Sequence, residues 1–207
     1  MSDTLPKTEK RKVWDVPTRL FHWALVGTVL TGLYLGEYRE FSTIQLHFYF
    51  GYATGGLLVF RLLWGVFGPA HARLSALFPS PGALIGYVQN MFARRPSGVA
   101  GHNPVGALSV LAMLTALCVQ VVTGLCAEDD GLFSEGPLVE YLDSSTVLTM
   151  TAIHHWSSRV VMALIVLHLA AILFYRLWKR EDLVTAMVTG WKTVRRPDDE
   201  SDDDRQA

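Results

Sequence analysis

Residues 149–178 read TMTAIHHWSSRVVMALIVLHLAAILFYRLW, an apolar stretch that is long enough to cross a bilayer and carries three histidines. Histidines inside a membrane are costly and mark functional sites. His154 and His168 are fourteen residues apart. On a helix they therefore lie about 40° apart around the axis and about 21 Å apart along it. His155 lies about 140° from His168 and points elsewhere. The spacing predicts two redox centres stacked across the bilayer.

The composition is that of a membrane protein. The chain has 207 residues, of which 50% are hydrophobic and 18% charged, whereas soluble domains carry about 25% charged residues. The apolar residues predict an all-α integral membrane protein, a bundle of four transmembrane helices. The expected spans are residues 20–35, 44–67, 104–126 and 149–178.

The cysteine pattern excludes several cofactor classes. The chain has two cysteines and no CxxC or CxxCH motif. This argues against covalently attached haem, zinc ribbons and iron–sulfur clusters. The polar, basic start of the chain has no cleavage-like segment beside it, so the first apolar run is expected to remain as a span.

The polar segments divide the chain into parts. Residues 1–12 are predicted to form a mobile cytoplasmic tail, 13–192 the four-helix domain, and 193–207 an acidic disordered tail. The long connection 68–103 contains a stretch, 83–95, with apolar residues at helical spacing. We expect that stretch to lie on the membrane surface as a short amphipathic segment.

Lysine and arginine placement predicts the orientation. Most of them lie in the two tails and in the 68–103 connection, while the other two loops hold Arg39 alone. Because basic loops stay in the cytoplasm, both termini are expected there. The acidic loop 127–148 is then expected to face the periplasm or its equivalent.

This topology pairs the histidines by depth. His22 and His168 are expected near the cytoplasmic surface, and His47 and His154 near the outer surface. Each pair joins a different helix to the last span, as bis-histidine ligation of b-type haem requires. Two axial histidines leave no open site on the metal, so the expected chemistry is electron transfer. Zinc fits less well because its ligands must converge on one point, and a proton relay would need carboxylates that the spans lack.

Other interpretations of these histidines stay open. A histidine near a helix end is often only an interfacial hydrogen-bonding residue, and we assign His155 and His71 no ligand role. His102, in GHNP before the third span, could replace His22 as an axial ligand. The favoured alternative is that His102 bonds a haem propionate or caps the third helix.

Arginines and glycines could support a macrocycle. Arg61 lies fourteen residues beyond His47, and Arg159 lies five residues beyond His154. Both, together with Arg19, are candidates to neutralise haem propionates. Snorkelling to lipid headgroups is the alternative for Arg19 and Arg61. Glycines in the spans would let helices or a porphyrin approach closely, although ordinary helix packing explains any single one.

Several motifs occur in an order typical of one family. They are VWDVPTRLFHW at 13–23, LHFYFGY at 46–52 with FRLLWG at 60–65, GHNPVGALSV at 101–110 and HHWSSRVVMALIVLH at 154–168. Over about residues 13–192 the chain resembles the bacterial cytochrome b561 family. The likeness is greatest to the branch that includes the b-type cytochrome subunits of nickel–iron hydrogenases. The resemblance implies a four-helix bundle with two b haems that moves electrons between the membrane quinone pool and a redox partner.

The family's ligand pattern is one histidine in each of the first two helices and two in the fourth. It maps onto His22, His47, His154 and His168. His155 stands where relatives often have Glu, and the helical-face argument favours His154 as the ligand.

The leading hypothesis is a multi-pass di-haem b-type cytochrome of a respiratory chain in the bacterial inner (plasma) membrane. Its expected partners are membrane lipid, quinone, and a periplasmic c-type cytochrome or hydrogenase subunit that docks near the acidic loop. No nucleic acid partner is expected, and a homodimer stays open. One alternative is an enzyme that oxidises quinol and passes electrons to oxygen or superoxide. Another is a haem-free membrane anchor or transport subunit.

Overall fold

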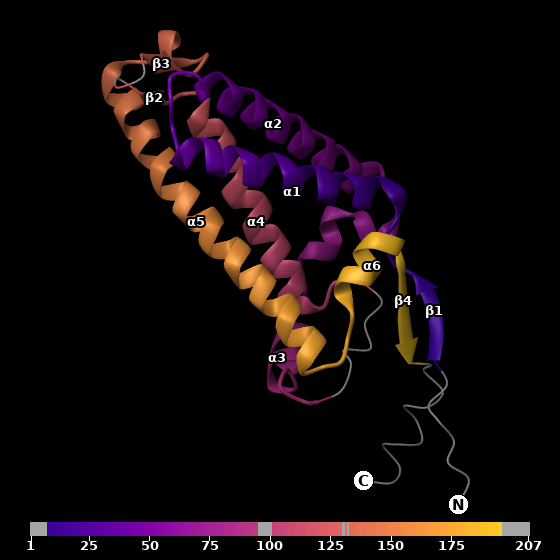
Figure 1. Ribbon diagram of the computed structural model, residues 1–207. Coiled ribbons are helices and arrows are strands. Elements are labelled where there is room, and N and C mark those ends of the chain that lie inside the picture. The colour runs from indigo at the N-terminus through magenta and orange to yellow at the C-terminus, as the bar shows by residue number, and fades with distance from the viewer. Residues whose placement is uncertain (1–7, 95–100, 130, 132, 196–207) are drawn as a thin grey trace, which may run out of the picture.

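Four long helices dominate the fold (Figure 1). The computed structural model describes residues 8–94, 101–129, 131 and 133–195. The long helices are α1 (Val16–Glu37), α2 (Ile44–Phe67), α4 (Pro104–Gly124) and α5 (Ser144–Leu177). Each begins close to where its apolar run was predicted, and α1 and α5 extend several residues beyond it.

Side-chain caps set the starts of three of these helices. Asp15, Asn103 and Asp143 each accept a hydrogen bond from a backbone N–H in the first turn. Such caps satisfy amide groups that have no partner within the helix. Prolines in the first turns of α1 and α4 fit there because that turn needs no N–H from them.

Three of the described helices, α2, α4 and α5, are long and apolar enough to cross a membrane. The chain is therefore a multi-pass membrane protein. Helix α1 has the length, at 22 residues, but its first turns carry Thr18, Arg19 and His22, and it is not among the three. The predicted span at residues 20–35, and with it the count of four, is thus not confirmed.

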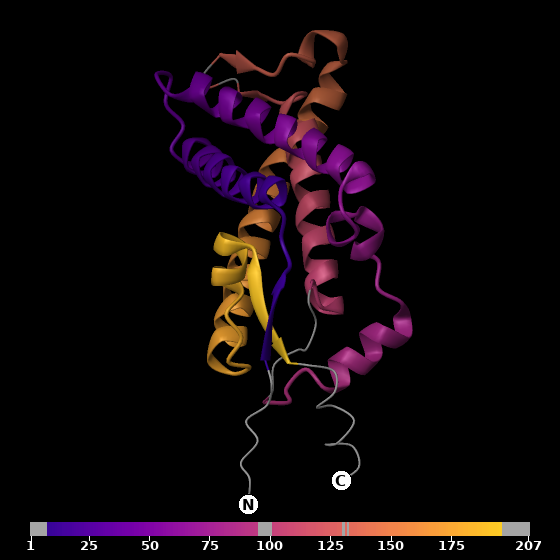
Figure 2. The same cartoon turned by 90° about the vertical axis from the view of Figure 1, so that its right-hand side faces the viewer.

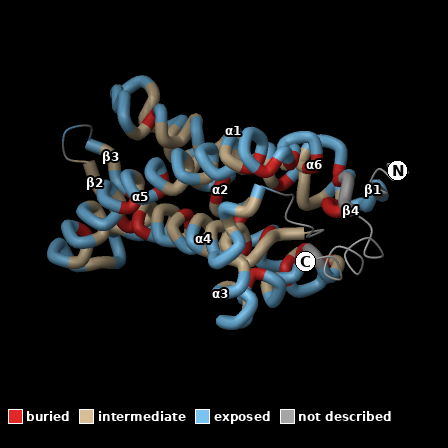
Figure 3. Tube along the Cα trace, turned by 90° about the horizontal axis from the view of Figure 1, so that it is seen from below, coloured by how far each residue is buried: buried red, intermediate tan, exposed pale blue. Residues whose placement is uncertain are grey.

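The long helices meet in a narrow apolar seam. Helix α1 packs mainly on α2, α5 packs on α4, and contacts between α2 and α4 join the two pairs. Leu58, Leu117 and Val161 form the buried centre, and apolar side chains from α1, α4 and α5 surround it. Figure 3 shows how few residues are buried along the helices. Most large apolar side chains are exposed, as they would be on a surface that faces lipid.

The two ends of the bundle differ (Figures 1 and 2). One end carries the α1–α2 link, η3 (Val139–Tyr141), and a small antiparallel pair of strands, β2 (Glu128–Asp129) and β3 (Ser134–Glu135). We call it the acidic end. The opposite end, the basic end, carries the remaining short elements. They are η1 (Ala70–Ala72), η2 (Leu74–Leu77), α3 (Pro81–Gln89), α6 (Leu183–Thr189), β1 (Thr8–Lys12) and β4 (Trp191–Arg195).

The strands correct two sequence predictions. Strand β1 pairs antiparallel with β4, with Lys10 opposite Thr193, so residues 8–12 are no mobile tail and 193–195 no disordered one. The fold is mostly helical but not all-α. Gly190 ends α6 with a φ of 86°, and its carbonyl accepts hydrogen bonds from the amides of Val13 and Trp14. A pairing between segments about 180 residues apart leaves no local sequence signal. Residues 1–7 and 196–207 of the predicted tails lie outside the described part of the chain.

The predicted surface segment is shorter than expected. Helix α3 runs over residues 81–89, so it covers only 83–89 of the predicted 83–95 stretch, and Ser80 caps it. None of its nine residues, all of which the structure describes, is buried. Ile85 and Val88 are 59% and 47% exposed, which leaves an apolar face open at the basic end.

Candidate functional site

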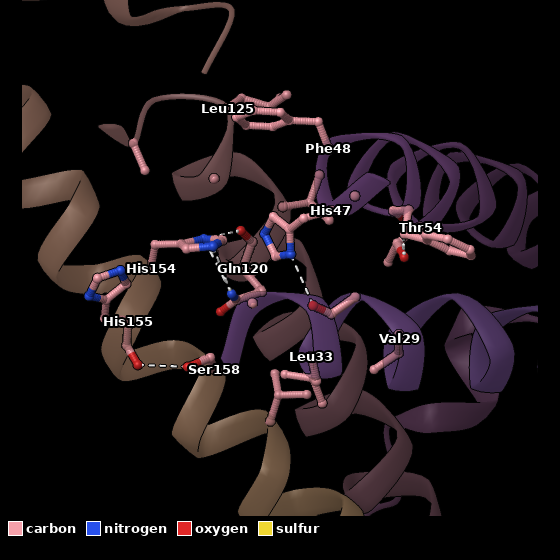
Figure 4. Close-up of a pocket in the computed structure, with 18 of the residues that line it drawn as sticks. Val29, Leu33, His47, Phe48, Thr54, Gln120, Leu125, His154, His155 and Ser158 are labelled. Carbon is pink, nitrogen blue, oxygen red and sulfur yellow. Dashed lines mark hydrogen bonds between the residues drawn. The ribbon is translucent and has the colours of Figure 1, made fainter. Parts of the chain in front are cut away.

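At the acidic end, two of the predicted histidines face each other. His47 comes from the first turn of α2 and His154 from α5, and their ring centres are 6.1 Å apart with the planes almost perpendicular, at 89°. They line a cavity of about 180 Å³ between the helices. Figure 4 shows both rings in this cavity. Residues 107 positions apart in the sequence are thus brought together at one level of the bundle.

A backbone carbonyl orients each of these two rings. Nδ1 of His47 lies 2.9 Å from the Gly32 carbonyl oxygen, and Nδ1 of His154 lies 3.0 Å from that of Gln120. Because a carbonyl oxygen only accepts, the proton of each neutral ring belongs on Nδ1. This leaves the lone pair of Nε2 of His47 available for a metal, which is the usual arrangement of metal-binding histidines, whereas Nε2 of His154 lies 3.2 Å from the amide nitrogen of Gln120.

Glycines make room for both rings. A Cβ at Gly36 would lie 3.0 Å from Cε1 of His47, and one at Gly124 would lie 2.7 Å from Cε1 of His154. Gly124 lies in α4 and Gly36 in α1, so each ring packs against the backbone of a neighbouring helix. Close approach of this kind is a reason for glycine inside a helix, where it otherwise costs stability.

The separation of the two rings fits a metal held between them. When two imidazoles bind opposite sides of one metal, the distance between their ring centres is the sum of two metal–nitrogen bonds and of the distance from each nitrogen to its ring centre. Each metal–nitrogen bond is about 2 Å long, so the ring centres lie about 6 Å apart. The 6.1 Å separation of His47 and His154 matches this value. The pair therefore suits a metal with two axial imidazoles, as in a bis-histidine haem.

The second predicted pair lies towards the basic end. His22 on α1 and His168 on α5 are both partly buried, and they are near enough for a charge on His168 to act on His22. Nδ1 of His22 is buried and has no hydrogen-bond partner among the described residues, as is also true of Nε of Arg19. Val161 lies seven residues from both His154 and His168. The apolar seam therefore crosses the bundle between the two pairs.

The candidate propionate partners Arg61, Arg19 and His102 each contact a different segment. Arg61 is buried, 6% exposed, and donates a hydrogen bond of 2.9 Å to the Ala72 carbonyl, so it does not extend to lipid headgroups. Arg19 packs against Gly190 at the end of α6. His102 packs on the Trp14 ring, with ring centres 4.6 Å apart.

Two candidates at the acidic end are exposed. Arg159 lies over the Trp156 ring, 4.8 Å from its centre. His155 sits at the edge of the cavity, with its ring centre 6.3 Å from that of His154. The structure does not bring Arg159 into this cavity lining.

Sequence reasoning missed the residues that surround His154. The amide nitrogen of Gln120 lies 3.2 Å from both ring nitrogens, and its amide oxygen accepts a hydrogen bond from the Ser157 hydroxyl. The Thr123 hydroxyl lies 3.4 Å from Nδ1. The signal in the sequence was Gln120 itself, because an amide inside an otherwise apolar span needs a polar partner.

Membrane-crossing helices that bring histidines together in pairs are typical of membrane b-type cytochromes, and this structure has that arrangement at the acidic end. A family described as prokaryotic cytochrome b561 matches residues 13–190 of this chain. The chain belongs to this family, and it is therefore a b-type cytochrome of electron transfer in a bacterial membrane that binds b-type haem. When bound, that haem supplies one-electron chemistry.

Two curated relatives extend along nearly the whole chain. One, from Rhizobium leguminosarum bv. viciae, is 21% identical over 226 residues, covering 90% of this chain and 90% of the relative. The other, from Cupriavidus necator, is 23% identical over 220 residues, covering 88% of this chain and 87% of the relative. Each is named a probable Ni/Fe-hydrogenase B-type cytochrome subunit.

Proposed function

We propose that this protein is a di-haem cytochrome that moves electrons between the quinone pool and a periplasmic redox partner. The observation that carries the proposal is the facing of His47 and His154 at 6.1 Å, each with Nδ1 on a backbone carbonyl. His22 and His168 would hold a second haem towards the basic end. Two sites on one bundle make an electron path along α5.

In the proposed topology, α1 crosses the membrane as well, which gives four spans. The basic end faces the cytoplasm. The distribution of lysine and arginine supports this orientation. So does the placement of β1 and β4 at the same end as α3 (Figure 2). The acidic end then lies in the periplasm of a cell whose inner membrane holds the protein, and its cavity is the haem site nearest to a periplasmic partner.

The names of the two relatives favour a hydrogenase subunit as the partner, with a c-type cytochrome as the other candidate. Carboxylates at the acidic end suit a partner with a basic docking surface. Arg19, Arg61, His102 and Arg159 remain the proposed partners of haem propionates. Of these, Arg19 has a buried Nε without a hydrogen-bond partner among the described residues, which makes it the best-supported propionate ligand at the basic end.

The test is the haem content of the purified protein. We expect a pyridine haemochrome assay to give two haems b per chain. His168→Leu should leave one, and His154→Leu should also leave one. His155→Leu should leave both, because His155 is exposed and lies off the face that His154 shares with His168.

Specific results would overturn the proposal. Purified protein without haem would exclude both haem sites. If His155→Leu, but not His154→Leu, removed a haem, the wrong histidine would have been assigned at the acidic end. Rapid oxygen consumption with quinol and no protein partner would instead indicate a quinol-oxidising enzyme.

A further inference from the structure

One residue of α4 contacts the imidazole of His154 from two directions. Nδ1 of the ring lies 3.0 Å from the backbone carbonyl oxygen of Gln120, which accepts its proton. The side-chain amide nitrogen of Gln120 lies 3.2 Å from both ring nitrogens (Figure 4). At this distance, a point in the ring plane that is equally far from both nitrogens would overlap a ring carbon. The amide nitrogen therefore lies over the face of the ring, and the in-plane lone pair of Nε2 stays open.

The two contacts together fix the plane of the His154 ring. A single hydrogen bond leaves an imidazole free to turn about the line that joins its two atoms. A second contact, over the face of the ring, removes this rotation. Gly124 restricts the ring further, because a Cβ there would lie 2.7 Å from Cε1 of His154. The ring is thus restricted along its edge and on its face.

A hydroxyl group on α5 holds the Gln120 amide in place. Ser157 lies one turn after His154, is buried, and donates a hydrogen bond to the amide oxygen of Gln120. Because this oxygen is bound to Ser157, the amide nitrogen is directed towards the imidazole. An amide within an apolar bundle is stable only when polar partners of this kind satisfy it. Helices α4 and α5 therefore orient this ring jointly.

The orientation of His154 matters because the partner ring lies at a right angle to it. The planes of His47 and His154 are 89° apart. Two axial imidazoles with perpendicular planes interact with different d orbitals of an iron, whereas parallel imidazoles interact with the same one. Perpendicular planes therefore keep two d orbitals close in energy. A low-spin ferric iron in that state gives an EPR signal dominated by one large g value, and parallel planes give a rhombic signal.

We propose that Gln120 is a positioning residue that holds the His154 ring perpendicular to the His47 ring and so sets the electronic state of an iron between them. The inference rests on the proposed function, since it needs a haem iron with both histidines as axial ligands. Gln120 acts through the His154 ring, because its carbonyl and its amide both contact that ring. A ligand fixed in this way reorients little when an electron arrives or leaves, which favours electron transfer.

The test is the EPR spectrum of the ferric, haem-loaded protein in the His168→Leu background, where only the acidic-end pair can hold haem. We expect a single large-g signal there. Gln120→Met in this background has a side chain of similar size without a donor or an acceptor, and the Ser157 hydroxyl keeps a bond of 3.2 Å to the His154 carbonyl. The haem should be retained and the large-g signal lost to a rhombic one. A large-g signal that persists in Gln120→Met would overturn the inference.

A second variant leaves Gln120 unchanged and decides the matter if Gln120→Met does not retain haem. Ser157→Ala frees the amide, so the large-g signal should lose intensity to the rhombic one. Ser158→Ala is the matched control and should leave the spectrum unchanged, because the Ser158 hydroxyl donates to the His155 carbonyl. Equal spectra for Ser157→Ala and Ser158→Ala would refute the role of Gln120. A background protein without haem would contradict the proposed function, whereas a haem-loaded one with a rhombic signal contradicts the inference alone.

Discussion

Four backbone positions set the orientation of the His47 and His154 rings at the acidic end. Gly36 and Gly124 lie against the two rings, and Gly32 and Gln120 supply the carbonyls that orient them. A side chain at either contact position would push its ring away from the hydrogen bond. The two imidazoles are thus positioned by residues on helices other than their own.

Gly124→Ala is expected to remove the acidic-end haem and spare the other. The new Cβ would lie 2.7 Å from Cε1 of His154, closer than carbon atoms pack. Alanine is the better helix former by about 1 kcal/mol, so weakening of α4 would not explain the loss. The measurement is the haem-to-protein ratio of the proposed di-haem protein, which should fall by about half. Gly56→Ala is the control, since nothing lies within 4 Å of its Cβ and it does not line the cavity; two haems in both variants would contradict the ring-contact argument.

Helix α5 contributes one histidine to each pair, and contacts with other segments stabilise both of its ends. Asp143 caps its first turn. After its last turn, the Glu181 amide donates to the Tyr175 carbonyl, and Glu181 also forms a buried ion pair with Lys192 of β4. Tyr175 in the last turns bonds through its hydroxyl to Tyr87 of α3. These contacts hold the helix in register with the segments at each end.

The cap of α5 predicts a pH dependence of stability. Hydrogen bonds from the Ser145 and Thr146 hydroxyls and the Thr146 amide hold the pKa of Asp143 well below its usual range. Because the folded-state pKa is lowered, this stabilisation is complete above the unfolded value of about 4 and is lost as the pH falls through the folded value. Asp143→Asn keeps a capping side chain but removes the charge.

Thermal unfolding in detergent checks this prediction. At pH 7 the Asp143→Asn variant should melt below the wild type, and the difference should shrink as the pH falls below about 4. Glu140→Gln is the control, because it removes a nearby carboxylate that does not cap α5. A difference in melting temperature that stays constant with pH would show that the charge of Asp143 adds nothing.

The Glu181–Lys192 pair predicts a strong single-site effect at the other end of α5. Glu181 and Lys192 are 7% and 8% exposed. Removing one partner of a buried ion pair costs about 3–5 kcal/mol because the other charge stays buried, whereas replacing both with apolar residues costs little. Glu181→Leu should therefore lower the free energy of unfolding far more than Glu181→Leu combined with Lys192→Met. Equal losses in the single and double variants would show that the two side chains are not coupled.

The whole molecule is polarised, with carboxylates at one end and lysines and arginines at the other. Strands β2 and β3 carry Glu128, Asp129 and Glu135 at the acidic end. The basic end gathers Lys10, Arg11 and Lys12 of β1. Charge at one end steers a partner of opposite charge before any contact forms.

Electron exchange with a basic partner should therefore depend on salt. We expect the second-order rate constant to fall by about tenfold between 10 and 150 mM ionic strength. Neutralising the acidic end with Glu135→Gln and Glu140→Gln should lower the low-salt rate and flatten this dependence. Stopped-flow absorbance of the haem bands measures it, with Glu9→Gln at the basic end as the control. A rate independent of salt in the wild type would exclude electrostatic docking.

Much of the arrangement could be predicted from the chain alone. The helix positions followed from the apolar runs, because these are a local signal. The sharing of one α5 face by His154 and His168 followed from helical geometry. The pairing of His47 with His154 by depth agrees with the facing rings. The roles of these residues as haem ligands remain predictions.

The sequence by itself determined the mostly helical membrane fold, the meeting of His47 with His154 and the contrast between acidic and basic ends. These properties depend on period, length and composition, which a linear chain displays. Only the tertiary structure decided that Gly32 and Gln120 hold the acidic-end rings, that His22 is left without such a carbonyl, and that β1 pairs with β4. These contacts join residues far apart in the chain, and packing between elements sets them rather than any local preference.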